Sequence, residues 1–310
     1  MTTGLMTHGA CFAHEPPPGH PESPRRLQAV LNGLRQCDLR KLTAARATRE
    51  QLVRAHAPEM VDSVLGHSNE EAQDSGYARL DADTFMSAGS AEAALFAAGA
   101  VVGAVDAVVL GEVRNAFCAV RPPGHHAERA TPMGFCLFNN VAVGALHARS
   151  VHGAERIAAI DFDVHHGNGT QDIFSNDPDL FYASTHQMPL YPGTGYEIEG
   201  GVAGNVLNRP LNPGSGSREF RAAYKDSIFP ALEAFAPEFV FISAGFDAHQ
   251  ADPLANLNVS ADDFGWVTAE ICAVAARVCQ GRVVSSLEGG YDLKALEESA
   301  AAHVGALIEA

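Results

Sequence analysis

Four short apolar runs along the chain each end abruptly in ionisable side chains. They span Ala116 to Val120, Ile157 to Ile160, Phe239 to Ala244 and Arg282 to Leu287. Runs of this length, bounded by turn-forming residues, predict strands that are buried on both faces of a parallel sheet. Because ligands bind beyond the carboxyl ends of the strands in open α/β sheets, the four junctions predict one shared cleft.

Segments of helical length separate the predicted strands. We expect helices over Ala88 to Leu110, Val141 to His152 and Lys294 to Ile308, another that opens at Ser260 and carries Trp266 and Ile271, and an N-terminal helix from Pro24 to about Gln36 capped by Ser23, after a first strand at Leu5 and Met6. This order, without a low-complexity linker, predicts a single α/β domain over residues 1–310. Its core is one open, mostly parallel sheet with helices on both faces.

The segment Gln187 to Ser217 departs from this alternation. It holds seven glycines and four prolines in 31 residues, around one short strand candidate from Asn205 to Leu211. Loops of this length inside a compact domain are usually functional. We therefore expect the segment to form part of the rim above the cleft.

Composition narrows the choice of partners and compartment. The 21 basic side chains are outnumbered by 37 acidic ones, and the formal charge of −16 would repel a nucleic-acid backbone. The longest apolar stretch, Ala93 to Val105, has 13 residues, short of the roughly 20 that span a bilayer, so we expect a buried helix and no membrane contact. Met1 to Ala13 lacks the features of a signal peptide, and the six cysteines form no C-x-x-C pair, which favours a cytoplasmic protein.

The junction that follows Ile160 has the highest density of side chains that bind metals or protons. If the strand continued, its alternation would put Asp161, Asp163 and His165 on one side. A lone D-x-D is usually a polar turn, but Asp247 follows the third run and completes a set of three ligands, the number typical of a catalytic zinc. Two carboxylates would neutralise the ion, which could still polarise a carbonyl and acidify its water.

Two further junctions supply proton carriers and a neutral donor. His125 and His126 titrate near neutral pH and could exchange protons with water and with a leaving amine. Asp161 and Asn168 could each hold an imidazole Nδ1–H and fix its tautomer. Tyr291, delivered by Gly289-Gly290, could hydrogen-bond the oxyanion of a tetrahedral intermediate.

Seven motifs between His20 and Tyr291 occur in a specific order. They are His20 to Arg26 (HPESPRR), Arg121 to Glu128 (RPPGHHAE), Gly134 to Cys136 (GFC), Asp161 to Gln171 (DFDVHHGNGTQ), Ser243 to Ala248 (SAGFDA), Asp252 to Leu254 (DPL) and Glu288 to Tyr291 (EGGY). On these motifs the chain resembles the zinc-dependent histone deacetylase family. The resemblance is specifically to its class II-like branch, which includes bacterial amidohydrolases, and it implies the arginase/deacetylase fold.

The resemblance also implies a role for each matching residue. One Zn²⁺ per chain would be bound by Asp163, His165 and Asp247, with His126 as general base and acid, His125 as its electrostatic partner and Tyr291 polarising the scissile carbonyl. A structural K⁺ would be bound by Asp161, Ser184 and the backbone of Asp163, His165 and Thr185. Gly134, Phe135 and Tyr191 would line a narrow channel for an acyl-lysine stem, with Leu254 at the rim and Arg26 near an acetate exit path.

Three positions refine the resemblance. Tyr191 stands where phenylalanine is common, which affects how tightly the stem is held. Asn168 follows the class II pattern, whereas class I members carry Asp. Leu254 replaces an acidic gatekeeper and argues mildly against a specialised polyamine deacetylase.

The leading functional hypothesis is hydrolysis of an N-acyl amide by metal-activated water, most simply acetyl-lysine in a protein or peptide. An acetylated polyamine or another small amide is the alternative substrate, and a homo-oligomer remains open. A binuclear manganese ureohydrolase would need further aspartate ligands, and an inactive acyl-lysine reader would not need the intact set of catalytic residues. The remaining histidines, among them His56, His147, His152 and His303, show no convergent spacing, so we expect packing or surface roles for them.

Overall fold

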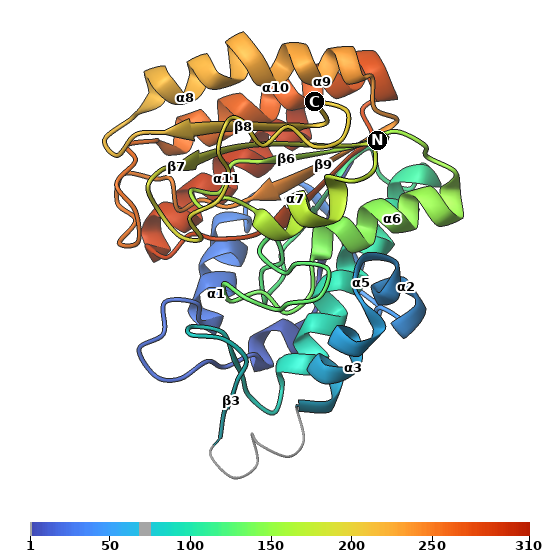
Figure 1. Cartoon of the computed structure of the whole chain (residues 1–310), viewed down its shortest axis with the longest axis vertical. Coiled ribbons are helices and arrows are strands. Elements are labelled where there is room, and N and C mark those ends of the chain that lie inside the picture. Colours follow the sequence, from blue (N-terminus) through green and yellow to red (C-terminus); the bar gives the residue numbers. More distant parts are fainter. Residues whose placement is uncertain (1, 68–75) are drawn as a thin grey trace.

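One eight-stranded sheet organises the protein, here a computed structural model that describes residues 2–67 and 76–310. Its strand order is β2-β1-β5-β10-β9-β6-β7-β8, and every pairing within it is parallel. Figure 1 labels β6, β7, β8 and β9 of this sheet. The strands are β1 (Thr3–Thr7), β2 (Leu39–Thr43), β5 (Ala116–Cys118), β6 (Ile157–Asp161), β7 (Leu180–Gln187), β8 (Val206–Leu211), β9 (Phe239–Ala244) and β10 (Val283–Leu287). A separate antiparallel pair is formed by β3 (Ala78–Arg79) and β4 (Phe85–Met86).

The four strands predicted from the apolar runs are neighbours in the middle of this sheet. β5, β10, β9 and β6 follow one another in the strand order, and all their residues are buried. Parallel strands that are covered on both faces favour continuous apolar sequence, which is why these runs were recognisable. Their carboxyl ends therefore meet at one edge, as predicted.

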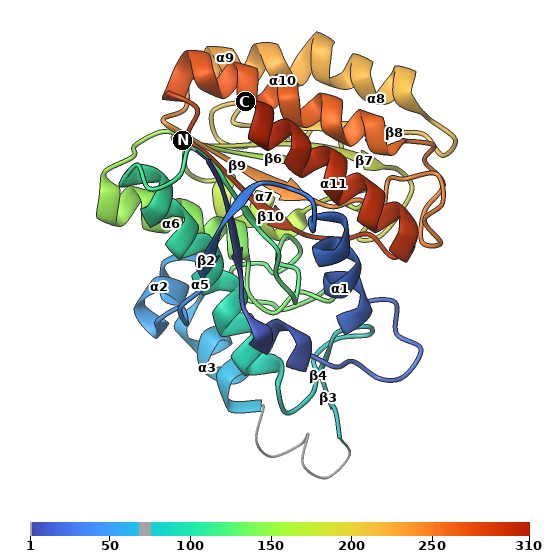
Figure 2. The same cartoon turned by 180° about the vertical axis from the view of Figure 1, so that it is seen from behind.

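Helices cover both faces of the sheet, as Figures 1 and 2 show from opposite sides. α5 and α6 pack together on one face, whereas α1 and α10 both pack against α11. The helices are α1 (Pro24–Gly33), α2 (Arg49–Ala55), α3 (Pro58–His67), α5 (Ser90–Val109), α6 (Asn140–His152), α7 (Asn168–Phe174), α8 (Ser217–Ala223), α9 (Phe229–Phe235), α10 (Ala261–Cys279) and α11 (Leu293–Glu309). The described residues also form a 3₁₀ turn (Gly9–Ala13) and a π-helical turn (Tyr224–Ile228).

The alanine-rich helix α5 contains the long apolar stretch of the sequence. It is the one helix among the described residues with the length and apolar composition of a membrane span, and 72% of its most apolar window is buried inside the protein. The small side chains of this helix allow neighbouring segments to approach closely. Gly99, for example, lies directly against the backbone of residues 45–47. The prediction of a buried helix is confirmed.

Some predicted boundaries are wrong. α1 ends at Gly33, not near Gln36, and Ser23 occupies the N-cap position without a side-chain capping bond, so Pro24 starts the helix through its fixed φ. A 3₁₀ turn at Gly9–Ala13 precedes the irregular, proline-rich segment that leads into α1. Edge strand β2 was not predicted because its sequence, LRKLT, is polar and partly exposed.

Candidate active site

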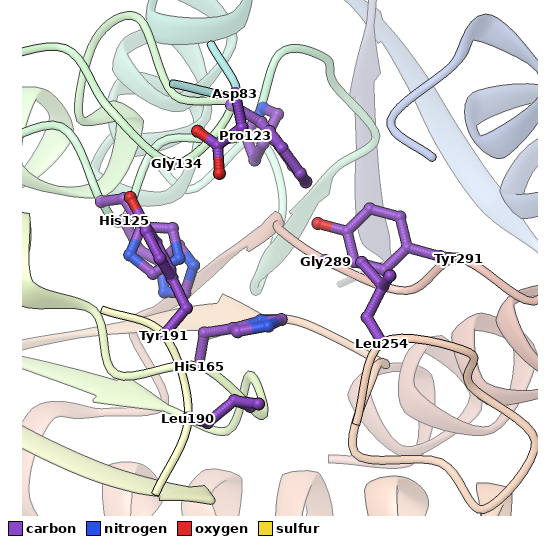
Figure 3. A pocket seen from close by; sticks show the side chains of 12 residues that line it. Asp83, Pro123, His125, Gly134, His165, Leu190, Tyr191, Leu254, Gly289 and Tyr291 are labelled. Carbon is purple, nitrogen blue, oxygen red and sulfur yellow. The ribbon is translucent and has the colours of Figure 1, made fainter. Parts of the chain in front are cut away.

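A pocket of about 210 Å³ opens at the carboxyl edge of the sheet. Figure 3 shows its lining side chains converging from separate strand ends. The lining residues are Asp83, Pro123, His125, His126, Gly134, Phe135, His165, Leu190, Tyr191, Leu254, Gly289 and Tyr291. The prediction of one shared cleft is confirmed, since all four central strands and the loop after β7 contribute to it or to its floor.

The three predicted zinc ligands meet beside this pocket. One donor atom from each of Asp163, His165 and Asp247 lies within 4.8 Å of the other two, and we call these three residues the trio. His165 Nδ1 is 3.1 Å from Asp163 Oδ1 and 3.1 Å from Asp247 Oδ2. Residues 84 positions apart in sequence are thus brought to one point by the adjacency of β6 and β9.

Backbone donors hold the two carboxylates in place. Asp163 Oδ2 accepts a hydrogen bond from the Gly289 N–H at 2.8 Å, and Asp247 Oδ1 accepts one from the Val164 N–H at 2.8 Å. Gly245 and Gly289 are needed here, because a Cβ at either position would overlap the carboxylate oxygens of this group. The ligand atoms are therefore fixed by main chain, not by mobile side chains.

The chemistry of this donor set fits a divalent cation. Burial alone would lower the pKa of His165, but hydrogen bonds and charge from Asp163 and Asp247 outweigh it and raise that pKa to about 10. The two buried carboxylates therefore strongly favour a positive charge between them. A cation coordinated by one imidazole and two carboxylates supplies that charge, and the set matches the N/O ligands of zinc.

Asp161 is placed differently from the sequence prediction. β6 ends at Asp161, so strand alternation does not continue to Asp163 and His165, and Asp161 is not a member of the three-ligand group. Its Oδ2 instead lies 3.0 Å from His125 Nδ1 and accepts from the Tyr182 hydroxyl at 3.2 Å. The expected continuation of the strand is wrong, whereas the expected bond to an imidazole is confirmed.

The tandem histidines are held in different electrostatic states. Burial would lower the pKa of His125, but Asp163 and Asp161 outweigh it and raise that pKa to about 10. The pKa of His126 is lowered well below its usual value by burial, and then by the positive charge of His125 and His165. His126 is therefore the neutral member of the pair.

The tautomer of His126 follows from its partner. His126 Nδ1 lies 2.8 Å from Asn168 Oδ1, while Asn168 Nδ2 donates to Glu128 Oε1 at 2.8 Å. An amide oxygen can only accept, so Nδ1 carries the proton and Nε2 keeps a lone pair. The predicted orienting role of Asn168 is confirmed in its geometry, and His126 can accept a proton through Nε2.

Glu288 supports the tandem histidines, a contact that sequence reasoning missed. Its Oε2 accepts from the backbone N–H groups of Gly124 at 2.6 Å and His125 at 3.1 Å. Burial raises the pKa of Glu288 to about 7. The available signal was the glutamate directly after a buried strand, since a buried carboxyl needs donors.

Tyr291 faces the histidines across the pocket (Figure 3). Its backbone N–H donates to Asp252 Oδ2 at 2.7 Å, and Asp252 Oδ1 accepts from the Leu254 N–H at 3.0 Å, so Asp252 braces both rim residues. Burial raises the pKa of the Tyr291 phenol well above its usual value, which keeps it a neutral donor. Gly290, with φ of 120°, allows the turn that aims the ring.

Phe135 and Tyr191 line the pocket as predicted, and their rings contact different catalytic candidates. The Tyr191 ring meets His126 edge-on with centroids 5.2 Å apart, whereas Phe135 meets Tyr291 edge-on at 6.0 Å. Phe135 has a left-handed backbone with φ of 68°. Gly134 precedes it, and a Cβ on Gly134 would overlap the His126 ring, so this turn requires glycine.

Asp83 was not predicted, although it contributes a carboxylate to the pocket (Figure 3). It lies between β3 and β4, and its main-chain carbonyl is hydrogen-bonded to His20 Nε2 at 3.1 Å. No local pattern predicts this position, because the short pair of strands reaches the pocket only through tertiary packing.

The potassium site and the acetate exit path stay predictions. Asp161 and Ser184 are direct partners in the pairing of β6 with β7, and the Ser184 hydroxyl lies 2.9 Å from His186 Nδ1. Arg26 is buried under Tyr291, with its guanidinium carbon 4.8 Å from the ring centre, and donates to the Gly290 carbonyl at 2.6 Å. Neither arrangement tests the potassium site or the acetate path.

Two histidines that were given packing roles converge with an aspartate elsewhere. His147 and His152 meet Asp106, and their donor atoms lie within 4.8 Å of one another. The expectation that these histidines lack a convergent arrangement is wrong. The sequence could not show it, because Asp106 and the histidines come from different helices.

Comparison with known proteins agrees with this architecture. Residues 20–307 match the family profile described as the histone deacetylase domain. The chain is 40% identical to "Histone deacetylase 14, chloroplastic" of Arabidopsis thaliana, over 93% of this chain and 73% of that protein. It is also 40% identical to "Histone deacetylase-like amidohydrolase" of Pseudomonas aeruginosa, over 88% of this chain and 73% of that protein.

The fold is matched by a solved structure as well. The crystal structure of the HDA15 HD domain superposes with a TM-score of 0.92 at 35% identity, covering 99% of this chain and 88% of that one. The predicted arginase/deacetylase fold is confirmed. With matching sequence, fold and motif order, the chain belongs to the histone deacetylase family of hydrolases.

Proposed function

We propose that this protein is a zinc-dependent amidohydrolase that removes an acyl group, most simply acetyl, from the side-chain amine of lysine in a peptide or protein. The observation that supports this most directly is the position of His126. Its Nδ1 is committed to Asn168, and its free Nε2 lies in one pocket with the metal-binding trio and with Tyr291 opposite.

The group bound by Asp163, His165 and Asp247 would be one Zn²⁺, which would supply a Lewis acid for the acyl carbonyl and lower the pKa of water. His126 Nε2 takes a proton from the attacking water as the oxygen–carbon bond forms. Tyr291 donates its hydroxyl hydrogen bond to the oxyanion that develops. His126 then returns the proton to the amine nitrogen as the carbon–nitrogen bond breaks, which yields a carboxylate and a free amine.

His125 contributes charge to this scheme without exchanging protons. Its raised pKa keeps it cationic near neutral pH, and its ring centre is 4.0 Å from that of His126. A fixed cation at that distance disfavours a long-lived second positive charge on His126. His126 therefore releases its proton readily to the leaving amine.

The lining of the pocket suits a linear acyl-amine stem. Phe135, Leu190 and Leu254 provide apolar surface along the approach to the trio. Buried apolar contact favours the methylene chain of lysine and tolerates several acyl groups. We also propose that residues 1–310 act as one catalytic domain, and that K⁺ binds near Asp161 and Ser184.

A small acetylated amine is the second candidate substrate. Asp83 places a carboxylate on the pocket, where it would attract the free ammonium group of an acetylpolyamine. The relative from Pseudomonas aeruginosa is named an amidohydrolase, which is compatible with this broader chemistry. The apolar Leu254 at the rim favours the lysine peptide.

A chelation experiment tests the proposed function. The protein is stripped with a chelator, assayed on a fluorogenic acetyl-lysine peptide and on acetylputrescine, and then reloaded with Zn²⁺. We expect hydrolysis to disappear and return with the metal, and the peptide to be the better substrate. Activity that is unaffected by chelation would reject the mechanism. Faster hydrolysis of acetylputrescine than of the peptide would make the small acetylated amine the leading substrate.

A further inference from the structure

A second group of metal-type ligands lies between helices α5 and α6. His147 Nε2 is 2.8 Å and His152 Nε2 is 2.6 Å from the same oxygen, Asp106 Oδ1. The side chain of His147 is 6% exposed, that of His152 16% and that of Asp106 42%, so the group is rooted in the helices yet open to solvent. We call these three residues the interhelical group.

Hydrogen bonding alone accounts for the present tautomers. Arg54 Nη1 lies 3.1 Å from His147 Nδ1, and a guanidinium can only donate. His147 Nδ1 is therefore an acceptor, and its Nε2–H donates to Asp106. His152 Nε2 must likewise carry a proton to bond the same oxygen, so one carboxylate oxygen accepts from two imidazoles.

The same three donor atoms could coordinate an ion after only small movements of the side chains. Zinc ligands at about 2.0–2.1 Å in a tetrahedral site are about 3.3 Å apart, so each imidazole here would need to withdraw by about half an ångström or slightly more. Burial would raise the pKa of Asp106, but its hydrogen bonds to His147 and His152 outweigh that and lower it, so it is a carboxylate at neutral pH. Two imidazoles and one carboxylate form a ligand set used by zinc and other first-row divalent metals.

We propose that Asp106, His147 and His152 bind a first-row divalent cation such as Zn²⁺ and so clamp α5 to α6. On binding, each imidazole moves its proton from Nε2 to Nδ1, and Nε2 becomes a ligand. Arg54 must then turn away from His147 Nδ1, while its bond to Glu50 at 3.0 Å can be kept. Arg54 thus competes with the ion and weakens the site relative to the trio in the pocket.

The test counts metal on the intact protein. Wild-type protein is equilibrated with Zn²⁺ at graded free concentrations, and bound zinc is measured by elemental analysis together with the melting temperature. We expect one tight equivalent, and a weaker second equivalent that raises the melting temperature as it fills. His152→Gln should weaken the second equivalent by about tenfold or more, since even indirect partners of a metal ligand contribute 10–100-fold.

Arg54→Ala provides the opposite change and His8→Gln the matched control. Removing the competing donor should tighten the second equivalent, whereas His8, which stacks on Phe96, should leave it unchanged. Deacetylation by all three variants reports that the fold is intact. Equal zinc binding by wild type, His152→Gln and Arg54→Ala would reject the site and leave a permanently hydrogen-bonded cluster, whether or not the pocket is active.

Discussion

The trio in the pocket and the interhelical group use the same residue types in opposite settings. Asp163 and Asp247 are fully buried beyond strand ends, and each accepts a main-chain N–H. Asp106 lies on a helix with its side chain nearly half exposed, and its carboxylate is hydrogen-bonded to two imidazoles. Main-chain support therefore distinguishes the preorganised centre in the pocket from the more exposed interhelical group.

That difference has an energetic basis. Ligands that are locked by backbone and packing do not reorganise when charge develops, which is what a reaction centre requires. In the half-exposed interhelical group, water and Arg54 compete with the ion for the ligand atoms. This group would therefore release its ion more readily. The two groups should therefore respond very differently to the same substitution.

Replacing the equivalent aspartates should give the largest contrast. Asp247→Ala removes a ligand of the trio, and we expect loss of the tight zinc equivalent and at least about a 10³-fold fall in kcat/KM, because Lewis-acid stabilisation contributes several kcal/mol. Asp106→Ala should keep the tight equivalent and the activity and lose the weak one. Paired metal analysis and peptide assays check both, and equal loss of activity would break the comparison.

The phenol opposite the trio should have the next largest effect. Tyr291→Phe removes one donor to the oxyanion, so kcat should fall by about 10²–10³-fold while zinc content stays unchanged. Tyr191→Phe is the matched control, because it keeps an aromatic wall and removes only a partly exposed hydroxyl. Wild-type kcat in Tyr291→Phe would show that the phenol takes no part in the chemistry.

Glycine substitutions test the main-chain support directly. A Cβ at Gly289 would overlap the carboxylates of Asp247 and Asp163, so Gly289→Ala should shift the ligands and lower kcat/KM by about 10²-fold, as expected for an ångström-scale displacement. Gly305→Ala is the control, because no atom lies within 4 Å of its added Cβ in α11. That variant should retain full activity and unfold with about 0.5–1 kcal/mol more free energy.

Mild acid should destabilise the fold through the buried His56. His56 Nε2 accepts from the Asn139 N–H at 2.9 Å, and its Nδ1 donates to the Glu128 carbonyl at 2.9 Å, so the ring must be neutral. Burial lowers its pKa from 6.5 to about 4. Its stabilising contribution is complete above the unfolded pKa and decreases as pH falls from about 6.5 to 4, on the order of 3 kcal/mol in total.

Urea unfolding between pH 7.5 and pH 5 measures this effect. The free energy of unfolding of the wild type should fall over that range, and His56→Gln should show a shallower fall. Other buried histidines, including His186 and His303, contribute to both curves and cancel in the difference. Parallel curves would mean that folding does not lower the pKa of His56.

The sequence was sufficient wherever the signal was local. Apolar runs that end in ionisable residues identified the four central strands, and the D-x-D-x-H spacing identified two of the three ligands. The pairing of His126 with Asn168 was also predictable, because the tautomer requirement of a proton carrier calls for an acceptor nearby.

The rest depended on tertiary packing. The Asp161 carboxylate contacts His125 and Tyr182, which come from other segments of the chain. Asp83 reaches the pocket through a short strand pair with no periodic pattern. His147 and Asp106 are 41 residues apart on two helices, and only the packing of α5 on α6 brings them together.

The position of β10 has a consequence for folding during synthesis. This strand, near residue 285, inserts between β5 and β9, so the sheet consists of two parts that cannot join until it arrives. A nascent chain that lacks β10 exposes two unpaired, apolar edges in the centre of its future core, a state prone to aggregation. We therefore expect protein truncated before Val283 to require chaperones or to precipitate, even though it contains Asp163, His165 and Asp247.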